Sequence, residues 1–134
     1  MSVTGIHCDP EQLLIGFFPT VLTVRALTDT PPDLANVITD VGGVIQVFRI
    51  GGPTGAPGFD YPTVDIDCYG LNRPAAKALA YQAQAACEFQ LCGYGNRYGT
   101  VQTVRTISGP SWRPYANTNV SRVGFTVRLA IHSR

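Results

Sequence analysis

The stretch "TVDIDCYGLNRPAAKALAYQAQAACEFQLCG", residues 63–93, holds a strand pattern followed at once by a helix pattern. In its first part, Val64, Ile66 and Cys68 alternate with Asp65 and Asp67, the period-two pattern of a strand with one apolar and one polar face. The second part predicts a helix of roughly 18 residues, about 27 Å long. A half-polar strand joined to a long helix predicts an α+β fold in which the helix covers the apolar side of a sheet.

The ends of this helix are marked by residues with capping roles. Asn72 is placed to cap its N-terminus, Pro74 suits the first turn, and Gly93 is placed to end it. A mainly alanine stripe recurs at helical spacing, so we expect the helix to lie close against the sheet, through Ala76, Leu79, Ala80, Ala83, Cys87 and Leu91. The opposite side is polar and contains Lys77, Tyr81, Gln84 and Glu88.

Further elements are predicted on both sides of this stretch. Residues 8–18 read as a helix capped by Asp9 and ended by Pro19, and strands are expected at residues 20–27, 44–50, 100–107 and 121–131, with 44–50 inside the sheet. In the last strand one face is apolar and the other carries Arg122, Thr126 and Arg128. The order α-β-β-β-α-β-β predicts a single domain over residues 1–134, with a mainly antiparallel sheet of four to five strands and two helices packed on one face.

Three segments are predicted to lack regular structure. Pro31 and Pro32 make residues 28–43 an expected loop. Residues near 51–62 and 108–121 are rich in glycine and proline and are expected to project from the sheet as long loops. Prolines stiffen both loops, and their aromatic and arginine side chains are typical of interaction surfaces. The candidate interface residues are Gly51, Gly52, Pro53, Phe59, Trp112, Arg113 and Tyr115.

Composition excludes several broad classes of function. The formal net charge is +1, with nine acidic residues and ten basic residues that are nearly all arginine, so no strong field attracts nucleic acid or an acidic membrane. Arginine in this proportion favours specific contacts with carboxylates. The N-terminus has no signal-peptide pattern and no stretch spans a bilayer, so we expect no membrane association and a soluble protein made in a cytoplasm, with reduced thiols.

No cofactor or metal is expected. The four cysteines lack C-x-x-C spacing and the two histidines lie near the chain ends, so the cysteines are interpreted as small buried apolar residues. The glycine-containing segments "CGYGNRYG" and "GGPTGAPG" lack the strand-to-helix context or the lysine of a phosphate-binding loop and are read as turns.

Asp65 and Asp67 permit two interpretations. Two carboxylates that are two positions apart on a strand stand roughly 6.5 Å apart, a separation that glycosidase pairs use. A glycosidase also needs a sugar cleft and one carboxyl group in an apolar setting, and the sequence indicates neither. The favoured hypothesis is that both pair with arginines on neighbouring strands, namely Arg122, Arg128 or Arg49.

Other catalytic and binding patterns are weaker. The sequence has no G-x-S-x-G elbow, and any Ser-His or Cys-His pair would need a terminal histidine. Several loop residues have side chains that stack on nucleotides, but the low net charge makes a protein surface the better interpretation of Arg97, Tyr98, Trp112, Arg113 and Tyr115. We therefore expect no enzymatic activity and a structural role.

The order of several segments resembles a known family. "DPEQLLIGFF", "VIQVFRIGGP", "DYPTVDIDCYGLNRPAAKALAYQA" and "RVGFTVRLAI" together resemble the tail terminator, or tail completion, proteins of long-tailed phages, in particular those that infect actinobacteria. The resemblance extends over nearly the whole chain. Its most specific part is an arginine-bearing strand with Gly-Gly-Pro, then an aspartate-bearing strand, an aromatic-Gly turn, Arg-Pro-Ala and an alanine-rich helix.

This resemblance implies a structural function without catalytic residues. Such proteins are α+β subunits that form a ring, expected here to be a homohexamer, on the end of the tail tube in the virion. The implied partners are further copies of the chain, the tail tube protein and the head-tail connector or stopper, and genome DNA passes through the ring without sequence-specific binding. The resemblance also implies that the strand ion pairs lie within the sheet or between subunits, and that the loop at 51–62 reaches a neighbour or the tube.

Three alternatives stay open. A head-side connector or stopper of the same junction has similar features, a small hydrolase would use Asp65 and Asp67, and a nucleic-acid-binding module would bind in a strongly salt-dependent manner.

Overall fold

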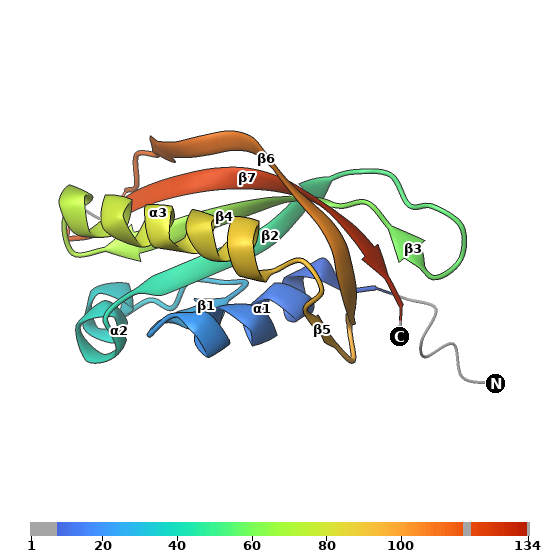
Figure 1. Ribbon diagram of the computed structural model, residues 1–134. Coiled ribbons are helices and arrows are strands. Elements are labelled where there is room, and N and C mark those ends of the chain that lie inside the picture. The colour runs from blue at the N-terminus through green and yellow to red at the C-terminus, as the bar shows by residue number, and fades with distance from the viewer. Residues whose placement is uncertain (1–7, 117–118, 134) are drawn as a thin grey trace.

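The computed structural model describes residues 8–116 and 119–133, and it has an α+β fold of three helices and one curled, mixed sheet (Figure 1). His7 and residues 117–118, within the predicted second loop, lie outside the described residues. The α+β class is therefore confirmed, whereas the predicted four to five strands and two helices are fewer than the seven strands and three helices of the described residues.

Seven strands form the sheet in the spatial order β1-β2-β4-β7-β6-β5, with β3 paired to the end of β7. Their bounds are Arg25–Leu27 (β1), Val44–Gly51 (β2), Phe59–Asp60 (β3), Thr63–Gly70 (β4), Gly95–Asn96 (β5), Gly99–Trp112 (β6) and Ser121–His132 (β7). All neighbours are antiparallel except β1 and β2, which are parallel. As predicted, the strand at 44–50 lies inside the sheet, between β1 and β4.

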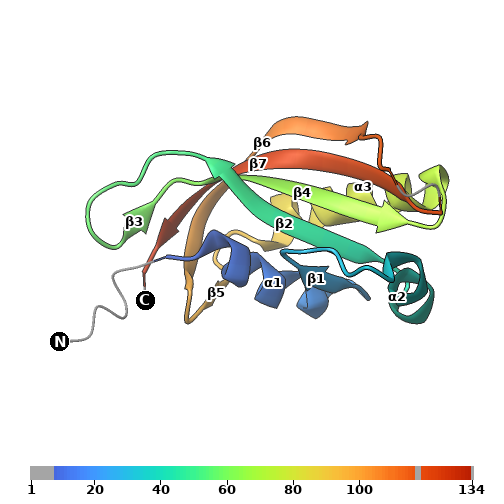
Figure 2. The same ribbon diagram turned by 180° about the vertical axis from the view of Figure 1, so that it is seen from behind.

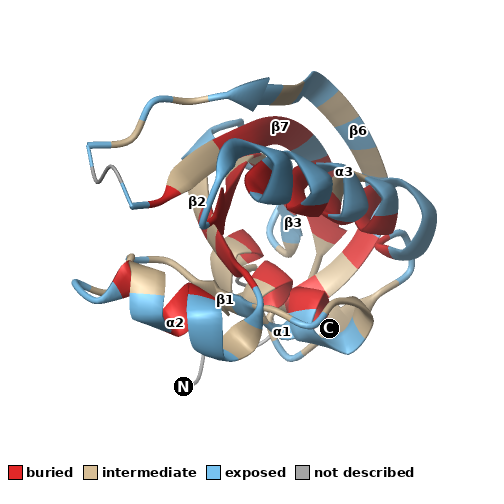
Figure 3. Ribbon diagram, turned by 90° about the vertical axis from the view of Figure 1, so that its left-hand side faces the viewer, coloured by how far each residue is buried: buried red, intermediate tan, exposed pale blue. Residues whose placement is uncertain are grey.

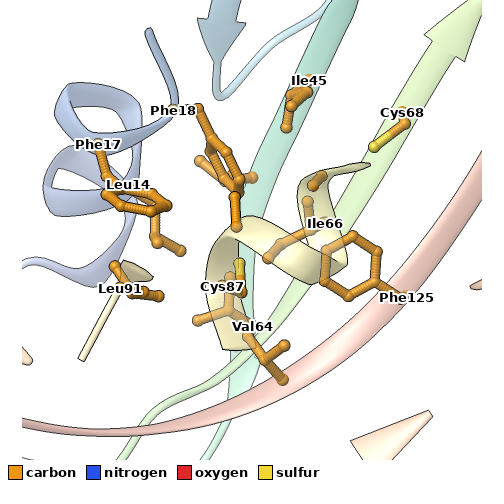
Figure 4. Close-up of a cluster of buried hydrophobic side chains, with 14 of the residues drawn as sticks. Leu14, Phe17, Phe18, Ile45, Val64, Ile66, Cys68, Cys87, Leu91 and Phe125 are labelled. Atoms are coloured by element: carbon orange, nitrogen blue, oxygen red, sulfur yellow. The ribbon is translucent and has the colours of Figure 1, made fainter. Parts of the chain in front are cut away.

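The main core lies between one face of the sheet and two helices, α1 (Pro10–Val21) and α3 (Arg73–Gln90). The predicted alternation of the last strand is confirmed, because Val123, Phe125, Val127, Leu129 and Ile131 are all buried on this face. They meet Phe17 and Phe18 of α1 and the alanine stripe of α3 (Figure 4). Figure 3 shows the same division, with the buried sides of α1 and α3 turned inward.

Helix α3 follows its sequence signals closely. The Asn72 side chain accepts a hydrogen bond of 2.9 Å from the Ala75 backbone N–H, and Pro74 lies in the first turn. Gly93 has a φ of +89°, the left-handed conformation that lets the chain leave a helix. The predicted stripe is buried throughout, and its small side chains let the helix lie close to the sheet.

Helix α1 continues past Pro19, which was expected to end it. Proline removes only its own N–H from the helical hydrogen bonds, and Pro19 lies on the exposed side, within the last turn. The helix ends at Val21, so the strand predicted at 20–27 shrinks to the three residues of β1.

A third helix, α2 (Leu34–Val41), occupies the segment predicted to be an irregular loop. The two prolines precede its N-cap residue Asp33, where they interrupt nothing, and Gly42 ends the helix at a φ of +87°. Leu34, Val37 and Ile38 bury one side of α2 in a second, smaller core. This core includes Val44 and Tyr69, which point away from the main core on β2 and β4, so both faces of the sheet are covered at this end.

Both predicted loops are partly ordered as strands. β6 runs to Trp112, so regular structure covers the start of the loop expected at 108–121. The segment at 51–62, which we call the arm, contains β3 and a bridge between Thr54 and Asp60. Figures 1 and 2 place the arm at the opposite end of the molecule from α2.

Candidate functional site

The face of the sheet opposite α1 and α3 carries the predicted carboxylates, and we call it the outer face. Strand register places Asp67 between Gln46 of β2 and Gly124 of β7. Asp65 lies between Phe48 and Thr126 in the same way. Both aspartates therefore project from one face, as the period-two pattern predicts.

Arg113, directly after β6, binds both carboxylates. Its Nη1 lies 2.7 Å from Asp67 Oδ1, and its Nη2 lies 3.4 Å from Asp65 Oδ1. Thr126 links the two sides, since its hydroxyl donates to Asp65 Oδ1 while Arg113 Nη2 donates to Thr126 Oγ1 at 3.3 Å. This cluster fixes the start of the 113–120 segment to the outer face.

Gly124 makes room for this ion pair. A Cβ atom at this position would overlap Asp67 Oδ1 and lie 2.8 Å from Arg113 Nη1. The missing side chain thus leaves a slot in the middle of β7 through which the guanidinium reaches a carboxylate on β4. Gly124 was not among the predicted site residues, although an isolated glycine within a strand pattern often marks such a close approach.

Asp67 is the most buried member, with 4% of its side chain exposed. Burial raises the pKa of Asp67 above its ordinary value, and the positive charge of Arg113 opposes that shift. The carboxylate is thus held in an unfavourable environment by its partner, which makes the pair a structural unit that loses much if one partner is removed.

A second network continues along the outer face toward α2. Tyr69 donates a hydrogen bond of 2.7 Å to Gln46, and its ring meets the ring of Tyr115 edge-on at 5.2 Å. The Arg122 guanidinium lies over the Tyr115 ring, 5.1 Å from its centroid, and donates a hydrogen bond of 2.7 Å to the Pro114 carbonyl. Tyr115 and Pro114 of the 113–120 segment are therefore also bound to the sheet.

The arm has its own arginine anchor. Arg49 of β2 binds Asp60 through two contacts, of 2.6 Å and 2.9 Å. The same guanidinium donates to the carbonyls of Gly51 and Gly52, at 3.1 Å and 2.9 Å. One arginine thus closes the base of the arm on both sides.

The backbone of the arm is shaped by glycine and by strand pairing. Gly52 has a φ of +99°, and a Cβ there would overlap the Tyr61 carbonyl. β3 pairs with the last residues of β7, which ties the arm to the edge of the sheet. Phe59 and Tyr61 remain 42% and 38% exposed, so the arm presents aromatic surface from a constrained backbone.

The predicted ion-pair partners require correction. Within the described chain, Asp65 and Asp67 pair with Arg113, and not with Arg122, Arg128 or Arg49. Arg49 shares a face with Ile45 and Val47, away from both aspartates. The period-two alternation of the strand already indicated this in the sequence. Arg122 packs on Tyr115, and Arg128 is exposed without an ion-pair partner among the described residues.

Of the predicted interface residues, Gly51, Gly52, Pro53 and Phe59 are exposed on the arm. Trp112 is half exposed at the end of β6, whereas Arg113 and Tyr115 are turned toward the sheet. The sequence analysis did not identify Asp60 as a site residue, because its ion pair with Arg49 forms only when the arm folds back onto the sheet.

The cysteines differ from one another in burial. Cys68 and Cys87 are buried, as expected, and burial raises the pKa of Cys87 to about 12. Cys8 is half-buried and Cys92 is exposed, so the prediction of buried cysteines is wrong for these two, and all four are free thiols. Over residues 8–116 and 119–133, no three side chains of His, Cys, Asp or Glu converge as metal ligands would.

No helix in the described part of the chain has the length and apolar character required to cross a membrane. A scan against models of known protein families finds no match to the sequence, and a comparison with curated proteins finds none either.

Proposed function

We propose that this chain is a structural virion protein. Copies of it form a ring, expected to be a homohexamer, on the end of a phage tail tube in the host cytoplasm, stop tube polymerisation and join the tail to the head. The resemblance of its segments to tail terminator proteins supports this role. The observation that carries the proposal is the use of its buried and half-buried carboxylates, because Asp60, Asp65 and Asp67 each bind an arginine that fixes a segment connecting two strands.

Such anchoring suits a subunit that docks on several partners. The arm and residues 113–115 are held in defined conformations by side-chain contacts, so less conformational entropy is lost when they bind a neighbour. They leave the sheet at different ends of the molecule, as expected for a subunit that contacts more than one partner. Head-to-tail contacts between identical copies form a closed ring when the rotations from each copy to the next add up to a full turn.

The decisive experiment is a stop codon early in the gene for this chain, followed by negative-stain electron microscopy of the phage lysate. Filled heads beside unattached tails of excess, irregular length are expected if the protein ends the tube. Unattached tails of uniform length would move the protein to the head side of the joint, as a connector or stopper. Normal infectious particles would contradict any role at this junction.

A hydrolase that uses Asp65 and Asp67 is tested separately. In the proposed role, Asp65→Asn and Asp67→Asn reduce stability or assembly, because they weaken the anchor of Arg113. If instead both variants keep their unfolding free energy and assembly while a hydrolytic activity of the purified chain disappears, the carboxylates are catalytic.

A further inference from the structure

A hollow of about 220 Å³ lies between the first half of α3 and the end of β6. Its lining includes Arg73, Lys77 and Tyr81 from the helix and Trp112 from the strand. We call it the α3/β6 pocket. Its volume is below the roughly 300 Å³ at which small-molecule sites begin, so it suits side chains of a docked protein better than a whole ligand.

The residue types in this pocket are those that dominate protein interfaces. Tyr81 and Trp112 are 51% and 49% exposed, and tryptophan, tyrosine and arginine are the commonest interface hot spots. The Arg73 guanidinium lies over the Trp112 ring, 4.6 Å from its centroid. Neither Arg73 nor Lys77 forms an ion pair with any described residue, so two positive charges beside aromatic surface stay available for an acidic partner.

An acidic segment of matching character is present elsewhere in the same chain. Residues 28–41, which join β1 to β2 and include α2, carry Asp29, Asp33 and Asp40, all of them exposed. None of the three forms an ion pair among the described residues, and the Asp33 side chain accepts no capping hydrogen bond at the start of α2. The segment contains no basic residue.

These two features lie on different sides of the first half of α3, because the end of α2 borders a hollow beside Ala75 and Leu79, whereas the α3/β6 pocket is lined by Arg73, Lys77 and Tyr81. The acidic segment belongs to the β1 and β2 side of the sheet, whereas β6 lies across β4 and β7 from it. Figure 3 shows α2 and β6 on separate sides, with α3 next to β6. The acidic segment of one copy is thus able to approach the α3/β6 pocket of another.

We infer that the α3/β6 pocket binds the acidic segment, residues 28–41, of a second copy of this chain. Asp29 and Asp40 approach Arg73 and Lys77, and the docked segment covers the exposed rings of Tyr81 and Trp112. The contact is head-to-tail, because the two surfaces differ, and repetition of such a contact builds a ring or a helix. The inference names the subunit interface of the proposed function and therefore rests on it.

Paired charge reversals test this interface in the purified full-length chain. Arg73→Glu with Lys77→Glu changes the pocket, and Asp29→Lys with Asp40→Lys changes the acidic segment, while Asp33 is kept as the N-cap of α2. Each pair is expected to weaken self-association at low ionic strength at least about tenfold, because like charges then face each other. The chain with all four changes is expected to regain association, because the charges are complementary again.

Two measurements are made on every variant. Sedimentation velocity over a concentration series reports self-association. The emission of Trp112, the only tryptophan of the chain, is expected to shift to shorter wavelength as the pocket becomes covered. Arg105→Glu with Arg128→Glu is the matched control, since it makes the same charge change at exposed positions on the outer face and is expected to leave association unchanged. Thermal unfolding confirms that each variant is folded.

Several results would overturn the inference. One is a wild-type chain that stays monomeric at every concentration. Another is a control variant whose self-association is weakened as much as that of the pocket variant. A third is that the folded chain with all four charge reversals associates no better than the pair variants. Salt-sensitive binding of a single-stranded oligonucleotide that Arg73→Glu with Lys77→Glu abolishes would assign the pocket to nucleic acid instead. The stop-codon lysate remains independent: unattached tails combined with a failed rescue would keep the proposed function and reject this interface.

Discussion

Two arginine anchors each hold a segment that connects two strands, but the arginine lies on the connecting segment in one anchor and on the sheet in the other. Arg113 belongs to the segment it anchors and reaches down to carboxylates on the sheet. Arg49 belongs to the sheet and reaches out to a carboxylate on the arm. When the first anchor breaks, the unpaired charge of Asp67 stays inside the sheet. When the second breaks, the unpaired charge of Asp60 lies on the arm, which is joined to the sheet edge by the two-residue strand β3 and which we expect to open into water. The same pair of residue types therefore stabilises the fold in one place and a local conformation in the other.

Arg113→Met breaks the first anchor and has the largest expected effect. It leaves Asp67 buried without its partner, which is expected to lower the free energy of unfolding by about 3 kcal/mol. Urea unfolding near pH 7 measures the loss. Acidification is expected to shrink the difference from wild type, because protonation removes the unpaired charge. Arg128→Met, at an exposed position, is the control, and an equal loss there would reject the anchor.

Gly124→Ala disturbs the same anchor at the point where the Arg113 guanidinium reaches Asp67. The new Cβ overlaps Asp67 Oδ1, so a loss of about 2 kcal/mol is expected, in the range of overpacked interiors. Combined with Arg113→Met, the loss is expected to be smaller than the sum, because the guanidinium that needs the slot is then gone. Strict additivity in urea unfolding would show that Gly124 acts independently of the ion pair.

Arg49→Met tests the second anchor. Because the arm is able to open and hydrate Asp60, the loss of global stability is expected to be only about 1 kcal/mol. Limited proteolysis is the sensitive measurement, and cleavage within residues 51–62 is expected to accelerate while the remaining sites keep their rates. Faster cleavage over the whole chain would mean that this anchor also supports the fold.

The smallest expected effect is a pH dependence at Asp67. Burial raises the pKa of Asp67 in the folded state, so the folded chain holds this proton more tightly than the unfolded chain. Stability from this group is then fully present below the unfolded pKa of about 3.9 and falls as pH rises through the higher folded value. The unfolding free energy of wild type is expected to decline relative to Asp67→Asn across that window, and a constant difference would contradict it.

The parts of the fold that followed from sequence are those set by local patterns. The alternation from Val123 to Ile131 and the cap signals at Asn72 and Gly93 each identify an element from its own residues, and the structure confirms them. α2 was missed because Pro31 and Pro32 were interpreted as breakers of the whole segment, although they lie before its N-cap.

The extension of β6 was missed for a related reason. Gly109 and Pro110 indicate a turn, but β6 pairs only with β7 beyond Thr103, and its bulges near Ser108 and Ser111 accommodate a proline. The partner of Asp67 was beyond local reasoning. Arg113 lies 46 residues away, and no local pattern distinguishes it from the other arginines until β4, β6 and β7 are side by side.

The unequal burial of the four thiols gives the unmodified chain a natural labelling position. Cys68 and Cys87 are enclosed in the core and Cys8 is half covered, while Cys92 is exposed just beyond the end of α3. A maleimide reagent used sparingly is therefore expected to attach at Cys92 first. A gold particle carried there would mark each subunit in electron micrographs without any change to the sequence.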